Sequence, residues 1–158
     1  MRIVIFLLLV LLALTQQSFA GETEYRTGGT KYERTWQAFY VEADHEPEID
    51  DPLIAKGKQM VLAICEAIRH KDMKRRRYAI GALGYIGDRT ALPTLESILI
   101  DETEIDYFRG DALHSIYQID RKLGLRYAAK FGTLGNTLGQ YAKAVLKREP
   151  WLLEPSQE

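Results

Sequence analysis

Residues 76–120 read RRYAIGALGYIGDRTALPTLESILIDETEIDYFRGDALHSIYQID, and the pattern of this stretch decides the fold. Its first apolar residues recur at intervals of three and four, which places them on one face of a helix. These residues are Ala79, Ala82, Leu83 and Ile86. The helix is expected to end at Gly87, because glycine adopts the left-handed conformation just past a helix terminus at little cost.

A second helix is expected directly after this turn. Asp88 and Thr90 are candidate N-caps, and Pro93 falls in the first turn, where its missing N–H costs little. The apolar stripe of this helix consists of Leu92, Leu95, Ile98 and Leu99. The two segments therefore predict a pair of short antiparallel helices joined by a tight turn.

The pattern repeats after about 33 residues, a spacing typical of helical-repeat proteins. This shift places Arg109 on Arg76 and matches four apolar positions: Ala79 with Ala112, Ile80 with Leu113, Leu83 with Ile116 and Ile86 with Ile119. The second copy is weaker, because Asp120 stands where the first has Gly87. We therefore predict an all-α fold: a short α-solenoid of antiparallel helix pairs, with about two clear repeats and capping helices.

The run ALGYIGDRTALPTLESIL at residues 82–99 resembles a HEAT repeat, in the form shared with the bilin-lyase (PBS-lyase) HEAT-like proteins. The matching features are an arginine on the first helix, Ala-Leu-Gly within it, Ile-Gly-Asp at the turn, and Ala91 with Leu95 on the second helix. The resemblance implies stacked helix pairs and protein binding, and it carries over no catalytic residue. The residues expected to be structural in the repeat are Gly84, Gly87, Asp88, Pro93 and Arg109. Gly84 lies inside a helix, which predicts a close approach of a neighbouring helix.

The first twenty residues predict export. Arg2 precedes an unbroken apolar run at residues 3–14, and Ser18 and Ala20 are small residues at the −3 and −1 positions before Gly21. The run is short for a membrane span, which needs about 20 apolar residues. We expect residues 1–20 to be a cleaved signal peptide, so that the protein is secreted or periplasmic and meets a membrane only during export. An uncleaved N-terminal anchor is the alternative.

Charge and composition narrow the class of function. The 21 basic and 22 acidic side chains nearly balance, which gives no basis for nucleic-acid binding. Cys65 is the only cysteine, which excludes a disulfide within the chain and predicts a buried thiol. We find no signature of a zinc site or a phosphate-binding loop, so no cofactor, metal or catalytic residue is predicted. His114 is expected to have a structural or surface role.

Residues 21–51 are expected to form a polar arm and an acidic linker, ahead of a helical domain at 52–149 and a tail at 150–158. Aromatic residues in the arm recur at helical spacing: Tyr32, Trp36, Phe39 and Tyr40. These rings predict either a cover over the open end of the helix stack or an arm that docks a partner. Six of the ten linker residues at 42–51 are acidic, which predicts a solvated connection. A calcium site there, including Asp51, is the alternative, although the glycine and terminal glutamate of an EF-hand loop are missing.

Further helices are expected at 52–70, 104–122, 125–131 and 137–148, with a capping box between Thr103 and Asp106. Five of the seven residues at 71–77 are basic. One arginine of this cluster is expected to pair with an acid or a carbonyl in the repeat, and the others form either a solvated helix start or a surface for an anionic partner. The candidate partner-binding residues are therefore Tyr32, Trp36, Phe39, Tyr40, Arg75, Arg76, Arg77 and, in the tail, Trp151.

These features favour an exported module or adaptor that binds a protein partner and has no catalytic activity of its own. Two alternatives remain at this stage. One is a bilin-lyase-like enzyme acting on a tetrapyrrole, which only the family resemblance raises. The other is a structural component of the envelope that self-associates through the aromatic arm or through Trp151.

Overall fold

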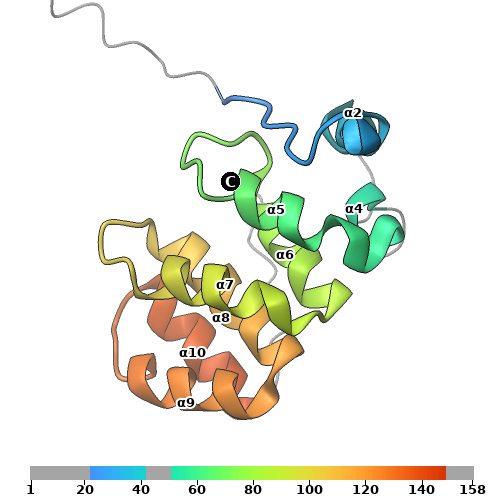
Figure 1. Cartoon of the computed structure of the whole chain (residues 1–158). Coiled ribbons are helices and arrows are strands. Elements are labelled where there is room, and N and C mark those ends of the chain that lie inside the picture. The colour runs from blue at the N-terminus through green and yellow to red at the C-terminus, as the bar shows by residue number, and fades with distance from the viewer. Residues whose placement is uncertain (1–21, 42–50, 149–158) are drawn as a thin grey trace, which may run out of the picture.

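The computed structural model describes residues 22–41 and 51–148, and this part of the chain is all-helical apart from turns and an isolated parallel bridge between Thr23 and Met73 (Figure 1). The predicted signal peptide, residues 42–50 of the acidic linker, and the tail with Trp151 lie outside the described residues. Within the described ranges, no helix is long and apolar enough to cross a membrane.

The helices pack against one another around α8. In chain order the α-helices are α2 (Glu33–Val41), α4 (Pro52–Lys56), α5 (Val61–Ala67), α6 (Arg76–Ile86), α7 (Leu92–Ile100), α8 (Asp106–Ile119), α9 (Arg121–Phe131) and α10 (Thr137–Lys147), with 3₁₀ turns at Thr30–Tyr32, Gly57–Met60 and Arg89–Ala91. Helix α8 contacts α6, α7, α9 and α10. Figure 1 shows α2 at one end of the molecule and α9 with α10 at the other.

The two predicted helices and the turn between them are confirmed. Helix α6 ends at Gly87, which has a φ of 71° and donates its N–H to the carbonyl of Leu83. The carboxylate of Asp88 then accepts a hydrogen bond from the N–H of Thr90, and Pro93 lies in the first turn of α7. The four predicted apolar residues of α7 are all buried. Local sequence signals therefore determine both ends of this turn.

The helix predicted over 52–70 is interrupted, and that prediction is wrong. Asp51 caps α4, which stops at Lys56 because Gly57 takes a φ of 64° and donates its N–H to the carbonyls of Leu53 and Ile54. A 3₁₀ turn then leads into α5, which ends at Ala67. Gly57 ends the helix at a point where the apolar stripe by itself predicted a continuous helix.

The helices predicted over 104–122 and 125–131 are both present, but the boundary between them lies earlier: α8 ends at Ile119 and α9 begins at Arg121. Asp120 adopts an extended conformation after α8, and its carboxylate accepts a hydrogen bond from the N–H of Leu123 to cap α9. The predicted capping box is also wrong, because Thr103 donates its N–H to Asp101 while Ile105 stands at the N-cap of α8 without a side-chain bond. Asp120, which stands where the first helix pair has Gly87, is thus the N-cap of α9.

Two glycines allow neighbouring helices to approach α8 closely. A Cβ atom on Gly84 of α6 would lie 3.0 Å from the Cα of Ser115, and a Cβ on Gly124 of α9 would lie 2.5 Å from the Cα of Tyr117. Any larger residue at either position would therefore push two helix backbones apart. The close approach predicted at Gly84 is confirmed.

Candidate binding surface

The aromatic arm is part of the core. Trp36 and Phe39 are fully buried and Tyr40 is 4% exposed, while the indole N–H of Trp36 donates to the carbonyl of Thr27 at 2.9 Å. Helix α2, which carries these rings, packs on α4. The rings therefore cover the first helices, as one interpretation of the sequence predicted. The partner-docking interpretation does not hold for these three residues, because a partner cannot reach them.

Polar contacts fasten the arm to the turn after α5. The N–H of Thr23 donates to the carbonyl of Asp72 at 2.8 Å, and the hydroxyl of Tyr25 donates to the Asp72 carboxylate at 2.9 Å. The Tyr25 ring stacks on His70 with the ring centres 3.8 Å apart. Tyr32 is half-buried, and its hydroxyl donates to a backbone carbonyl of the Gly57–Met60 turn. Residues 22–41 thus belong to the same packed body as residues 51–148.

The three consecutive arginines of the basic cluster have three different environments. Successive residues of a helix point about 100° apart, so neighbours in the sequence face different surroundings. Arg75 has a left-handed φ of 57° at the start of α6, and its guanidinium donates to the carbonyl of Phe39 and lies 5.0 Å from the centre of that ring. Arg75 therefore holds helix α2 against the body.

Arg76 is the structural arginine that the sequence predicted. Its side chain and that of Glu104 are 2% and 3% exposed and form an ion pair of 2.8 Å. Its Nε also donates to the carbonyl of Ile68 at 2.7 Å, just past the end of α5. Arg76 is consequently corrected as a partner-binding candidate, because its charge is used inside the protein.

Arg109, 33 residues after Arg76, makes a similar pair of contacts. Its Nε donates to the carbonyl of Leu99 at 3.0 Å, in the last turn of α7, and its guanidinium pairs with Asp106 at 2.9 Å. Carbonyls at the end of a helix lack a partner within the helix, so an arginine from the next helix satisfies them. The two arginines that coincide under the 33-residue shift therefore perform the same structural task.

Arg77 lies where α6, α8 and α10 meet. Its Nε donates to the carboxylate of Asp111 at 3.1 Å, and its guanidinium lies 4.3 Å from the centre of the Tyr107 ring. From α10, the hydroxyl of Tyr141 donates to the other oxygen of Asp111 at 3.0 Å. The Arg77 side chain is still 26% exposed, whereas that of Asp111 is 9% exposed. We call Arg77, Tyr107, Asp111 and Tyr141 the Arg77 cluster.

Burial controls the ionisation of this cluster. It raises the pKa of Asp111 to about 6, against the lowering effect of Arg77 and of the Tyr141 hydroxyl. Burial and the nearby Asp111 also raise the pKa of Tyr141, so that the phenol remains a hydrogen-bond donor. A Cβ atom on Gly110 would lie 2.6 Å from the Tyr141 ring, so this glycine lets the ring reach Asp111. At neutral pH the cluster therefore orients a guanidinium through an ionised carboxylate.

Exposed tyrosines continue this surface along α6. Tyr78 and Tyr85 are 40% and 43% exposed, and between them Gly81 has open space around it. The spacing of three, four and seven residues places them on one side of the helix. Arg77 is the one member of the Arg77 cluster among the residues predicted to bind a partner. Asp111 follows Arg77 by one repeat period plus one residue. This spacing was visible in the sequence, but one sequence alone gave no reason to prefer this pair over other charged residues.

The described residues form no metal site, and their one thiol is buried. Among the described residues, no group of three His, Cys, Asp or Glu side chains could hold a metal ion. Asp51, named with the acidic linker as a possible calcium ligand, is buried and accepts a hydrogen bond from the N–H of Leu53 at 2.7 Å. Cys65 is buried as predicted, and burial raises the pKa of its thiol.

Comparison of the chain with protein-family models, with curated proteins and with solved structures found no match. What the chain binds is therefore inferred from the chemistry of its own surfaces.

Proposed function

We propose that the chain is an exported helical-repeat module that binds a protein partner and has no catalytic activity of its own. Two observations support a HEAT-type α-solenoid. Helices α6, α8 and α10 are neighbours in space with α7 and α9 between them in sequence. Arg76 and Arg109 also bind the end of the preceding helix in the same way, one repeat apart. Such stacked pairs present extended surfaces for protein contacts.

The partner is expected on the surface formed by the Arg77 cluster and Tyr78. The observation that carries this proposal is that Arg77 is stacked on Tyr107 and bound by Asp111 while its outer part remains accessible. Arginine and tyrosine dominate the energetics of protein interfaces. A side chain that is already held in place also loses less entropy when a partner binds.

The buried charged side chains have structural roles, which supports binding rather than catalysis. The buried charged side chains of the described residues each take part in an ion pair or a helix cap; they are Asp51, Arg76, Glu104, Arg109 and Asp111. Self-association through the aromatic arm is not retained, because its rings pack inside their own chain.

Site-directed photo-crosslinking in the cells that make the protein tests this proposal. A photoreactive amino acid at Tyr78 should yield a discrete product with one protein, and the same group at Leu62, which is 75% exposed on α5, should not. Adding Arg77→Ala to the Tyr78-labelled chain should abolish the product. Equal products from both positions, or none from Tyr78, would refute the proposed surface. A shifted visible band on titration with a bilin would favour tetrapyrrole chemistry instead.

A further inference from the structure

The last two described helices carry charge of one sign only. Residues 121–148 contain seven lysines and arginines and no aspartate or glutamate, whereas the other described residues contain thirteen basic and fourteen acidic side chains. The near-neutral charge of the whole chain therefore conceals a strongly positive end of the molecule. In Figure 1 this end, formed by α9 and α10, lies opposite α2.

All seven of these basic side chains are exposed, and none forms an ion pair with another described residue. The ion pairs that join described residues use basic residues up to Arg109 in the chain. Charges that are neither paired nor buried project a positive potential into the solvent, and that potential attracts an anionic surface.

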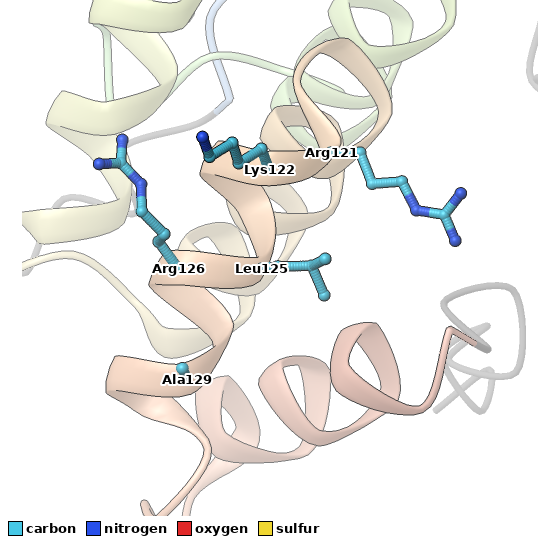
Figure 2. A pocket seen from close by; sticks show the side chains of 5 residues that line it. All are labelled: Arg121, Lys122, Leu125, Arg126 and Ala129. Carbon is cyan, nitrogen blue, oxygen red and sulfur yellow. The ribbon is translucent and has the colours of Figure 1, made fainter.

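Helix α9 gathers four of the seven charges around an apolar strip. Figure 2 shows Arg121, Lys122 and Arg126 on α9 around a shallow hollow that Leu125 and Ala129 also line. Lys130 follows Arg126 by one helical turn, so these six residues lie along one side of the helix. We call them the α9 basic face.

We propose that the α9 basic face binds the surface of an anionic phospholipid bilayer. A cluster of four to eight basic residues on an amphipathic helix suits anionic headgroups. The apolar strip of Leu125 and Ala129 can contact the boundary of the acyl chains, while the long basic side chains reach outward to the phosphates. On α10, Lys143 and Lys147 are exposed one turn apart and extend the positive field. This surface is separate from the Arg77 cluster, and its role does not depend on the proposed protein partner.

Single-stranded nucleic acid fits the face less well. Such ligands stack their bases on exposed aromatic rings. The aromatic rings beside the α9 basic face are those of Tyr117 and Tyr127, which are half-buried, and of Phe131, which is buried. The hydroxyl of Tyr127 donates to Glu96 at 2.7 Å, and the guanidinium of Arg121 lies over the Tyr117 ring at 5.7 Å. The face thus offers charge and aliphatic carbon rather than a stacking surface.

Vesicle flotation with the full chain tests the inference. The variant Arg121→Gln/Lys122→Gln/Arg126→Gln is compared with Arg34→Gln/Lys56→Gln/Arg69→Gln, which removes the same charge from exposed residues outside α9 and α10. We expect the wild-type chain to bind vesicles containing phosphatidylglycerol, and the α9 variant to bind them about 100-fold more weakly. The control variant should lose less than about threefold. Residues 1–20 are common to all three chains, so their contribution cancels.

Three outcomes would overturn the inference. The first is a wild-type chain that binds no vesicles, or an α9 variant that keeps the wild-type preference for anionic over phosphatidylcholine vesicles. The second is an equal loss in the two variants, which would indicate net charge rather than this face. The third is tighter binding at the same salt to duplex DNA or to an acidic protein than to the vesicles. Circular dichroism of each variant checks that the substituted helices remain folded.

Discussion

Replacing Gly84 by valine tests how closely α6 and α8 pack. A Cβ atom at this position would lie 3.0 Å from the Cα of Ser115 and 2.0 Å from the Oε1 of Gln118. The Gln118 side chain is exposed and can move away, whereas the Ser115 backbone belongs to the central helix. The substitution must therefore separate the two helices or distort one of them.

The cost follows from the packing. Adding methyl groups to a well-packed interface costs about 1–3 kcal/mol, and the better helix propensity of valine returns only a few tenths of that. The described body has roughly 120 residues, for which the unfolding entropy near 60 °C is about 0.25 kcal/mol/K. A loss of about 2 kcal/mol should thus lower the Tm by about 8 °C.

Gly81 provides a matched control, because it lies in the same helix with no atom within 4 Å of an added Cβ. Urea and thermal unfolding, followed by circular dichroism, should show Gly81→Val within about 0.5 kcal/mol of the wild type. The double variant Gly84→Val/Gln118→Ala should remain destabilised, because Ser115 is still in the way. If Gly84→Val matches Gly81→Val, or if removing Gln118 restores stability fully, the close approach of the backbones is not the reason for glycine.

Three further predictions concern the buried charges and the predicted signal peptide. Glu104→Ala leaves Arg76 buried without its ion-pair partner and should cost about 3–5 kcal/mol in urea unfolding. Asp106→Ala should cost less, because the Asp106 side chain is 29% exposed; equal losses would contradict the assignment. Because burial raises the pKa of Asp111 from 3.8 to about 6, the folded chain holds a proton between these values that the unfolded chain has released. This contribution to stability is therefore complete below about pH 4 and lost as the pH rises through about 6, on the order of 3 kcal/mol. Asp111→Asn should lack that decline when urea unfolding is measured from pH 4 to 7, and a wild type and variant with parallel pH profiles would exclude it. Mass spectrometry of the protein from its native source should show a chain that begins at Gly21, and a chain that retains residues 1–20 would refute cleavage.

Local signals predicted what local geometry controls. Gly87, Asp88 and Pro93 determine the turn between α6 and α7, because each restricts or satisfies the backbone within a few residues of itself. Where the predictions failed, two local signals competed. At Gly57 a left-handed glycine overrode an apolar stripe, and at Asp120 an N-cap set the boundary between two predicted helices a few residues earlier than periodicity had placed it.

The candidate surfaces depended on contacts between distant parts of the chain. The basic cluster was visible in the sequence, but its three arginines differ because Phe39, Glu104 and Asp111 come from other helices. Similarly, the aromatic spacing of the arm predicted a helix, and only packing against α4 showed that its rings are buried.

The sequence by itself determined the all-helical class and the main turn, because helix periodicity and caps act over one or two turns. It also marked Gly84, Arg76 and Arg109 as structural residues, although their contacts lie on other helices or turns. The tertiary structure alone decided which charges are buried and which face the solvent. Burial of a charge depends on partners that lie 28 residues away for Arg76 and 34 for Arg77. The same holds for α9 and α10, whose uniform charge became a defined surface only once packing on α8 turned their basic residues outward.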